Sequence, residues 1–370
     1  MTKREQSSPL PLKKRGRAHP TGDGDDASIS VVIPTYNGKE HILACLASLV
    51  RQTRPPCEIR VVDDGSRDGT VKAIRERYPQ VIVHALSPNQ GFCAAANIGL
   101  SAARGTLVLL LNNDTEVAAD CLDEVARAAH AFPDYGFFAP KMLFWDRRAT
   151  INSAGLFARP SGVSRDHGFN QPDGVSYATP LEVMGASGGA ALYRRALLDD
   201  VGFFDHDLGA YAEDVDLSLR AQMRGWRCVY LPRAVVYHRL GASFGRASVR
   251  KVFYSSRNGL TVVLKNWPLG LMLRHAPLMV AFHGYQILYN ARHGYGVPAL
   301  AALAGKLHAI ALLPSTLGKR RAIRRGYTVP AARFGELFDL PIMLAVPTVS
   351  TAKVAPPVGP TTTHREEVAS

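Results

Sequence analysis

Acidic residues are absent from a long stretch of this 370-residue chain. Between Leu217 and Gly335 there is no Asp or Glu, whereas 19 of the 44 Lys and Arg residues fall there. The net charge of +13 therefore arises in the C-terminal part, since the remainder carries 25 basic and 31 acidic residues. Such a block favours a polyanionic partner: a nucleic acid, an anionic membrane or a phosphate-bearing ligand. A solvated basic face without a partner is the alternative.

Cysteines are few, and none of the five is spaced as a C-x-x-C pair or a metal site. They lie in apolar runs, which predicts buried thiols in a reducing compartment rather than a disulfide framework. The N-terminal segment is polar and basic and lacks the apolar core of a secretory signal. These absences predict a cytoplasmic protein.

No apolar run reaches the roughly 20 residues that a membrane-spanning helix needs. Leu269–Phe282 and Val297–Leu313 are apolar but are interrupted by Arg274 and Lys306. Apolar helices with basic residues along one face lie in the membrane interface, and aromatic side chains favour the same depth. The aromatic residues in question are Trp267, Tyr285, Tyr289 and Tyr295. We expect peripheral contact with an anionic membrane, and a buried helical subdomain is the alternative.

Strand and helix patterns alternate through the first 140 residues. Short apolar runs predict strands at residues 29–34, 58–62, 81–86 and 106–111. The segments between them carry helical spacing, which predicts a mostly parallel sheet covered on both faces. Further along, the sequence predicts a helix at 213–224 and two closing strands at 227–231 and 234–237.

Polar residues gather where three of the predicted strands end. Thr35, Tyr36 and Asn37 follow the first strand, Asp63–Ser66 the second, and Asn112–Asp114 the fourth. Ligands of such sheets bind beyond the carboxyl ends of the strands. Because hard oxygen ligands suit Mg²⁺ or Mn²⁺ bridging phosphate oxygens, these clusters predict a site for a diphosphate ligand and a divalent cation.

The order of five motifs is more specific than any one of them. The motifs are Val-Val-Ile-Pro-Thr-Tyr-Asn (31–37), Val-Val-Asp-Asp-Gly-Ser (61–66), Asn-Gln-Gly-Phe (89–92), Leu-Asn-Asn-Asp-Thr (111–115) and Ala-Glu-Asp-Val-Asp-Leu (212–217). Together they resemble glycosyltransferase family 2, and in particular its bacterial rhamnosyltransferase-like branch, over about residues 28–238. The resemblance implies an α/β GT-A fold with a Rossmann-like, mostly parallel central sheet, to which we add a basic and mostly helical C-terminal appendage.

The resemblance also implies roles for residues at the strand ends. Thr35, Tyr36 and Asp64 would frame the base and ribose of a nucleotide-sugar, with Asp64 accepting the pyrimidine N–H. Asn89 and Asn97 would shape the donor pocket. The donor-binding set is completed by Pro34 and Asn113.

For the chemistry, the resemblance implies a metal pair and a catalytic pair. Asp114 would bind Mg²⁺ or Mn²⁺ with His238, although Asn112 stands where the family's first metal-binding Asp is usual. In the Glu213–Asp214 pair, Asp214 would be the general base that deprotonates the acceptor hydroxyl. The glycine-rich segment 185–189, with Gly188 and Gly189, resembles the family's acceptor-side loop.

The expected activity is inverting transfer of a sugar, such as rhamnose, from a dTDP- or UDP-sugar to a hydroxyl of a lipid-linked or cell-envelope glycan. We expect this at the cytoplasmic face of the plasma membrane. A polyprenyl-phosphate sugar transferase is the alternative enzyme, but it would require membrane-spanning segments, which the sequence does not show. A nucleotidyltransferase would share the sheet type but would require a glycine-rich phosphate loop after the first strand. Residues 34–37 are Pro-Thr-Tyr-Asn instead, which disfavours that activity.

A nucleic-acid-binding protein that uses residues 217–335 is the rival from another class. The stretch carries no recognisable nucleic-acid-reading motif, and its aromatic residues do not interleave with Arg, so we expect no nucleic-acid partner. The predicted organisation is a disordered tail at 1–27, the catalytic domain at 28–240, the basic helical region at 241–345 and a disordered tail at 346–370.

Overall fold

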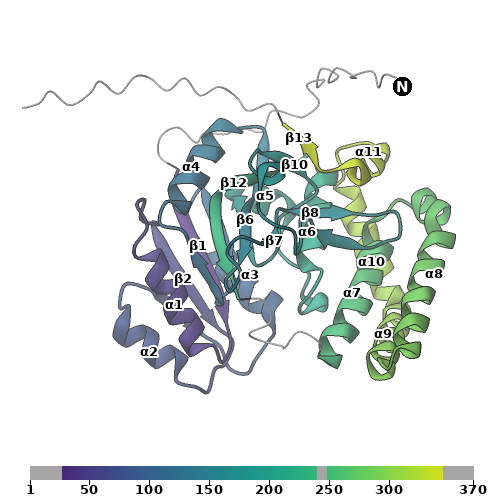
Figure 1. Ribbon diagram of the computed structural model, residues 1–370, viewed down its shortest axis with the longest axis horizontal. Helices are drawn as coiled ribbons and strands as arrows, with labels where there is room; N and C mark the ends of the chain where they lie inside the picture. The colour runs from purple at the N-terminus through teal and green to yellow at the C-terminus, as the bar shows by residue number, and fades with distance from the viewer. Residues whose placement is uncertain (1–26, 240–247, 345–370) are drawn as a thin grey trace, which may run out of the picture.

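The computed structural model describes residues 27–239 and 248–344, and both predicted tails, apart from Ala27, lie outside these ranges. One twisted sheet runs through the middle of the molecule, with helices on both faces (Figure 1). Neighbouring strands are hydrogen-bonded in the order β13-β10-β12-β6-β11-β4-β1-β2-β3, and in addition β5 pairs with β12 and β7 pairs with β6. The predicted boundary at residue 240 falls at the start of the gap between the described ranges and stays a prediction.

The first half of the sheet is parallel, as the alternating pattern predicted. Its strands are β1 (Ile29–Thr35), β2 (Glu58–Asp63), β3 (Ile82–Ala85) and β4 (Leu107–Leu111). Helices cover its faces: α1 (Lys39–Leu49), α2 (Thr70–Arg77), α3 (Phe92–Ala102) and α4 (Cys121–Ala131). In the register, Thr35 lies opposite Asp63, so the polar motifs after β1 and β2 meet at one edge of the sheet.

The second half of the sheet mixes directions. It contains β5 (Thr115–Val117), β6 (Tyr135–Phe144), β7 (Ile151–Ser153), β10 (Leu181–Val183), β11 (Ala190–Arg194), β12 (Arg227–His238) and β13 (Ile342–Met343). β11 lies antiparallel between β4 and β6, and β12 is parallel to β6. A separate hairpin is formed by β8 (Leu156–Ala158) and β9 (Ser164–Asp166).

The prediction of two closing strands was wrong in one respect. β12 is a single strand of 12 residues, and its pairing with β6 shifts register between Leu231 and Val235. The Leu-Pro-Arg stretch that was expected to separate two strands instead forms an irregularity within one. The end of β12 also pairs with β5, which places His238 opposite Thr115.

Short helices connect the strands of the second half. They are α5 (Arg195–Val201), α6 (Glu213–Met223), η1 (Val175–Tyr177) and η2 (His206–Leu208). α6 confirms the helix predicted at 213–224, so Glu213 and Asp214 occupy its first turn.

The C-terminal helices divide into an inner and an outer group. They are α7 (Val249–Asn266), α8 (Leu269–Arg292), α9 (Gly296–Ala311), α10 (Leu313–Arg325) and α11 (Ala332–Glu336), followed by η3 (Leu337–Asp339). α7 and α11 join the hydrophobic core through Val262, Trp267 and Phe334. α8 and α9 lie farther out, at the edge of the molecule (Figure 1).

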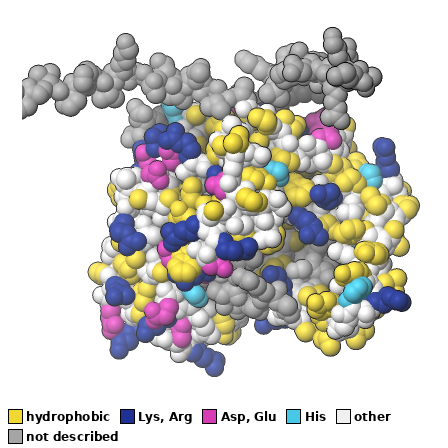
Figure 2. Space-filling view, viewed as in Figure 1, with side chains coloured by type: hydrophobic (Ala, Val, Ile, Leu, Met, Phe, Trp, Pro, Cys, Tyr) yellow, Lys and Arg dark blue, Asp and Glu magenta, His cyan; other side chains and the backbone are white. Residues whose placement is uncertain are grey.

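Two expectations about exposure can be compared with the structure. Four of the five cysteines are buried and Cys57 is exposed, so the prediction of buried thiols fails at that one position. Within residues 27–239 and 248–344 no single helix has the length and apolar character to cross a membrane, whereas α9 and α10, bent by 63°, meet both criteria as a pair. The lobe at the right of Figure 2, where α8 and α9 lie, carries mostly hydrophobic side chains with a few basic ones.

Candidate active site

The ends of β1 and β4 are joined by a hydrogen bond between two predicted donor-site residues. Asn113 Nδ2 donates to Thr35 Oγ1 at 2.8 Å, and both residues are buried. Gly38 makes this contact possible, since a Cβ there would lie 2.3 Å from Asn113 Nδ2. Pro34 is buried inside β1, whereas Tyr36 is 48% exposed and free to contact a ligand.

The two carboxylates after β2 differ in how their oxygens are used. Asp64 accepts the backbone N–H groups of Gln90 and Gly91 at 2.7 and 2.8 Å, and Asn89 Nδ2 donates to the Asp64 carbonyl. Asp64 and Asn89 therefore hold the loop at residues 89–91 beside the end of β2. Asp63 is also buried, and its Oδ1 accepts no hydrogen bond from the described residues. A buried carboxylate oxygen without a donor is costly, so Asp63 Oδ1 is a site for a ligand's N–H or hydroxyl.

Asn97 holds a loop by its side chain. Its amide pairs with the Phe204 backbone in both directions at 2.9 Å, and its Nδ2 lies 3.2 Å from His206 Nε2. This buried bracket ties α3 to the loop that precedes α6. Its predicted role in the donor pocket stays a prediction.

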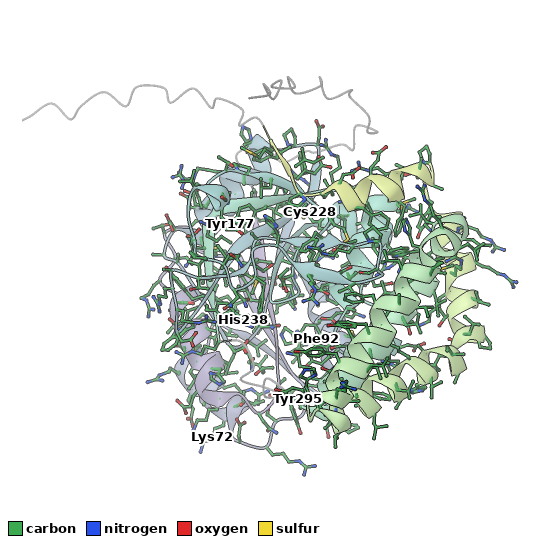
Figure 3. All side chains as sticks on the ribbon, turned by 45° about the vertical axis from the view of Figure 1, so that its right-hand side comes forward. Lys72, Phe92, Tyr177, Cys228, His238 and Tyr295 are labelled. Carbon is green, nitrogen blue, oxygen red and sulfur yellow. The ribbon has the colours of Figure 1, made fainter. Side chains whose placement is uncertain are left out.

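Asp114 and His238 lie next to each other, although 124 positions separate them in the chain. Asp114 Oδ1 is 3.3 Å from His238 Nε2 and is buried without a hydrogen bond. His238 Nδ1 donates to Asn152 Oδ1 at 2.9 Å, which leaves the Nε2 lone pair facing Asp114. His238 lies near the centre of the molecule (Figure 3).

This pair fits a divalent cation. Two ligands in adjacent octahedral positions, each about 2.1 Å from the ion, lie about 3 Å apart. Within the described ranges no cluster of three or more His, Cys, Asp or Glu side chains forms a complete protein cage. An ion held by Asp114 and His238 would therefore take its remaining ligands from phosphate oxygens and water, as Mg²⁺ commonly does.

The glycine-rich loop brings the metal pair and the catalytic pair together. Gly188 N–H donates to Asp214 Oδ2 at 2.8 Å, and a Cβ on Gly188 would lie 3.2 Å from Glu213 Oε1. A Cβ on Gly189 would lie 3.6 Å from His238 Cε1. The distance at Gly188 is tighter than an ordinary contact, and a Cβ on Gly189 would lie 2.6 Å from Met142 Cε. Glycine at both positions therefore lets the backbone pass between the two pairs.

Glu213 and Asp214 share a site that disfavours two negative charges. Burial and the Asp214 carboxylate raise the pKa of Glu213 to about 8. Burial also raises the pKa of Asp214, while the backbone N–H groups of Gly188 and Val215 oppose that rise. Asp214 is thus the member of the pair that is stabilised as an anion, and Glu213 Oε2 is buried without a partner.

Asp166 is a third carboxylate near these residues that sequence reasoning missed. It ends β9, and burial together with the Asp214 charge raises its pKa to about 6. The hydroxyls of Ser153 and Ser187 oppose this rise by donating to it. Asp166 falls in a stretch without periodicity or a motif, so only the folded hairpin reveals its position.

Helix α6 begins directly after a strained turn. Tyr211 and Ala212 have φ angles of 73° and 64°, which non-glycine residues seldom adopt. Asn258 of α7 is fully buried, and its Nδ2 lies 2.7–2.8 Å from the carbonyl oxygens of Leu208, Ala210 and Tyr211. Asn258 lies in the basic C-terminal region, yet its side chain fixes the turn that precedes Asp214.

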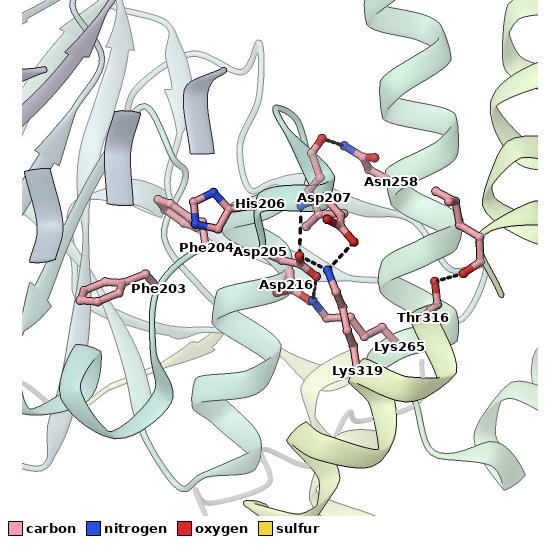
Figure 4. Close-up of polar contacts among 12 residues, drawn as sticks. Phe203, Phe204, Asp205, His206, Asp207, Asp216, Asn258, Lys265, Thr316 and Lys319 are labelled. Carbon is pink, nitrogen blue, oxygen red and sulfur yellow. Dashed lines mark hydrogen bonds and ion pairs between the residues drawn. The ribbon is translucent and has the colours of Figure 1, made fainter. Parts of the chain in front are cut away.

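A buried ion network ties α7 to the same segment (Figure 4). Lys265 Nζ contacts Asp205 Oδ2 at 2.5 Å and Asp216 Oδ1 at 2.8 Å, and Arg220 donates to the other Asp216 oxygen. Lys319 of α10 contacts Asp205 from the more exposed side. Because Asp216 is two residues beyond Asp214, this network sets where α6 begins.

Comparisons with known proteins find similarity to glycosyltransferases. Residues 30–202 match the family model described as Glycosyl transferase family 2. The N-acetylglucosaminyl-diphospho-decaprenol L-rhamnosyltransferase of Mycobacterium tuberculosis is 29% identical over 240 residues, which cover 59% of this chain and 78% of that protein. The resemblance to the rhamnosyltransferase-like branch of family 2 is thereby confirmed.

Solved structures agree on the fold. S. aureus TarS in complex with UDP-GlcNAc matches with a TM-score of 0.52 at 19% identity, over 84% of this chain and 90% of that chain. GalNAc-T7 with UDP, GalNAc and Mn²⁺ matches with a TM-score of 0.54 at 17% identity, over 74% of this chain and 59% of that chain. The predicted GT-A fold is confirmed.

The ion network predicts a large difference between its two lysines. Lys265→Met should lower the free energy of unfolding by roughly 3 kcal/mol, because it leaves buried carboxylates partly unpaired. Lys319→Met is the matched control and should cost about 1 kcal/mol or less, since that side chain is 35% exposed. Urea unfolding measures both. Equal losses would mean that the buried contact contributes no more than the exposed one.

The raised pKa of Glu213 predicts a pH-dependent stability. The folded protein retains the Glu213 proton more tightly than the unfolded chain, so this group's contribution is present below about pH 4.5 and is lost as the pH rises through about 8. Glu213→Gln stays neutral, so its melting temperature relative to wild type should rise between about pH 4.5 and about pH 8 and then level off. The exposed Glu76→Gln serves as control. A pH-independent difference for Glu213→Gln would contradict the raised pKa.

Proposed function

We propose, from the premise that residues 30–202 of this chain belong to glycosyl transferase family 2, that the protein is an inverting glycosyltransferase. The proposed reaction moves a sugar such as rhamnose from a dTDP- or UDP-activated donor to a hydroxyl of a lipid-linked or cell-envelope glycan. The observation that carries the proposal is the loop contact of Gly188 and Gly189, which joins Asp214 to the Asp114–His238 pair. A base and a cation-binding pair then lie on one edge of the sheet.

The donor would lie across the carboxyl ends of β1, β2 and β4. Thr35 and Asn113 give this edge a fixed shape, and Tyr36 presents an exposed ring. Asp63 Oδ1 offers a buried acceptor for a base or ribose donor group, and Asp64 holds the loop at Gln90 and Gly91 beside it. The TarS structure with UDP-GlcNAc supports a nucleotide-sugar donor, because a protein of similar fold binds one.

Asp114 and His238 would hold a Mg²⁺ or Mn²⁺ ion against the donor diphosphate. When bound, that ion would neutralise the charge that grows on the leaving nucleoside diphosphate. Asn152 keeps the His238 ring oriented by accepting from Nδ1, so the Nε2 lone pair stays available.

Asp214 would take the proton from the acceptor hydroxyl as its oxygen attacks the anomeric carbon. The new carbon–oxygen bond forms on the face opposite the diphosphate, while the bond from the anomeric carbon to the diphosphate oxygen breaks, which inverts the configuration. The Gly188 N–H holds one Asp214 oxygen, and protonated Glu213 avoids a second charge beside it.

The relative from M. tuberculosis supports the acceptor class, since its name describes an N-acetylglucosaminyl-diphospho-decaprenol acceptor. A lipid-linked acceptor of this kind is held at a membrane surface, so we extend the proposal to the cytoplasmic face of the plasma membrane. The identity of the sugar depends on single contacts in the donor pocket.

Replacement of the proposed base tests the reaction. With dTDP-rhamnose and a polyprenyl-diphospho-N-acetylglucosamine acceptor, Asp214→Asn should lower transfer by roughly 10²–10⁴-fold while donor binding stays near wild type. Glu213→Gln is the matched comparison and should retain more activity. An active Asp214→Asn enzyme together with an inactive Glu213→Gln enzyme would reverse the two assignments. A panel of UDP- and dTDP-sugars identifies the donor.

Removal of the cation tests the metal pair. EDTA should abolish Mn²⁺-dependent donor binding in calorimetry, and Asp114→Asn should weaken Mn²⁺ binding without a change in melting temperature. Asp120→Asn, at an unrelated carboxylate on α4's N-terminal side, is the control. Unchanged donor binding and full transfer in EDTA would refute the metal assignment.

A further inference from the structure

The helix α9 is built with its large apolar side chains facing away from the protein. Its buried residues are all small: Ala299, Ala301, Ala302, Gly305 and Ala309. Its exposed residues are large and apolar, with 42–67% of each side chain accessible: Val297, Leu300, Leu303, Leu307 and Ile310. A surface helix of a water-soluble domain normally shows the opposite arrangement.

Close packing of the small residues fixes this orientation. A Cβ at Gly305 would lie 2.4 Å from the Phe253 carbonyl oxygen and 3.0 Å from the Arg257 N atom, both on α7. No larger residue fits at that contact, so α9 cannot rotate to bury its leucines against α7. Small residues that allow two helices to approach closely are also how helices pack where the surroundings are apolar.

The neighbouring helix α8 extends the same surface. None of its residues is buried, and Leu273, Val280 and Leu288 are exposed at intervals of seven and eight, which places them on one face. Tyr285 and Tyr289 are exposed on α8, and Tyr295 lies in the turn to α9 (Figure 3). Aromatic side chains with a polar end favour the boundary between lipid and water.

Charge distinguishes what can cover this surface. Exposed Arg274 and Arg292 lie on α8, and Arg321, Arg324 and Arg325 on α10 are exposed as well. The whole stretch from Leu217 to Gly335 contains no acidic residue. Two copies of the chain would bring these cations together, whereas an anionic bilayer offers apolar chains and negative headgroups at once.

We propose that the outer face of α8 and α9 is a docking face that lies in the interface of an anionic lipid bilayer. The docking face consists of Leu273, Val280, Leu288, Val297, Leu300, Leu303, Leu307 and Ile310. It inserts its leucines among the acyl chains without a spanning segment, while the arginines contact phosphates. α9 packs on α7, and α7 holds the turn before Asp214 through Asn258, so docking brings the candidate active site to the membrane surface.

Co-sedimentation with vesicles tests the docking face. The full chain should bind phosphatidylcholine vesicles that contain one-third phosphatidylglycerol, bind pure phosphatidylcholine weakly, and be partly released by salt near 1 M, where screening is nearly complete. Leu300→Ser/Leu307→Ser should lower binding at least tenfold with an unchanged melting temperature, because both side chains are already exposed. Val175→Ser, which removes a still more exposed apolar side chain outside the docking face, should bind like wild type.

A second set of variants separates charge from apolar contact. Arg274→Gln/Arg292→Gln should weaken binding to anionic vesicles and leave the weak binding to neutral vesicles unchanged. Asp214→Asn should bind vesicles like wild type, so docking and catalysis fail independently of each other. Equal binding to both lipid compositions would overturn the electrostatic part. Absence of vesicle binding, with a dimer in light scattering that Leu300→Ser/Leu307→Ser abolishes, would overturn the proposal in favour of a second copy.

Discussion

The buried contact of Lys265 with Asp205 and Asp216 connects the C-terminal helices to the part of the chain that contains the sheet. Lys265 is 2% exposed and Asp216 is fully buried, so neither charge can be left without the other. The lysine comes from the C-terminal helices and the two aspartates flank the segment that leads into α6. The position of α6 therefore depends on residues more than 40 positions further along the chain, and with it the position of Asp214.

The same constraint explains how an unfavourable site can persist. The turn at Tyr211 and Ala212 is strained, and the Glu213–Asp214 pair places two carboxylates in one buried space. Each feature alone favours a different local conformation. The three carbonyl contacts of Asn258 hold the turn, and the Gly188 N–H holds Asp214. Packing of the helical region is thus coupled to the position of Asp214.

Much of the sheet edge could be predicted from the sequence because its signals are local. Apolar runs set the strands, and the motifs after β1, β2 and β4 meet because parallel strands end at one edge. Asp114 and His238 were paired through the resemblance, and their separation of 3.3 Å agrees with that pairing. The roles implied for Asp64 and Asn97 were less complete, since their side chains also hold backbone that no local pattern indicates.

Other residues of the site could not be predicted because their partners are distant. Asn258 and Lys265 resemble ordinary polar positions on an amphipathic helix until α7 is seen against the turn before α6. Hydrophobic periodicity detects that α9 has a large and a small face, but it leaves open whether the large face packs on the protein or lies in a membrane interface. Only the close contact of Gly305 with α7 reveals that the leucines face outward.

The register shift in β12 affects which face of the strand carries His238, the partner of Asp114. Side chains alternate between the two faces of a strand, so the number of residues between Leu231 and Val235 determines which face the end of β12 presents. After the irregularity, the register of β12 with β5 and β6 puts the His238 side chain on the same side as Asp114. A deletion that slipped the register of the end of β12 by one residue would turn the imidazole to the opposite side. The position of His238 beside Asp114 thus depends partly on a stretch of β12 outside the candidate site.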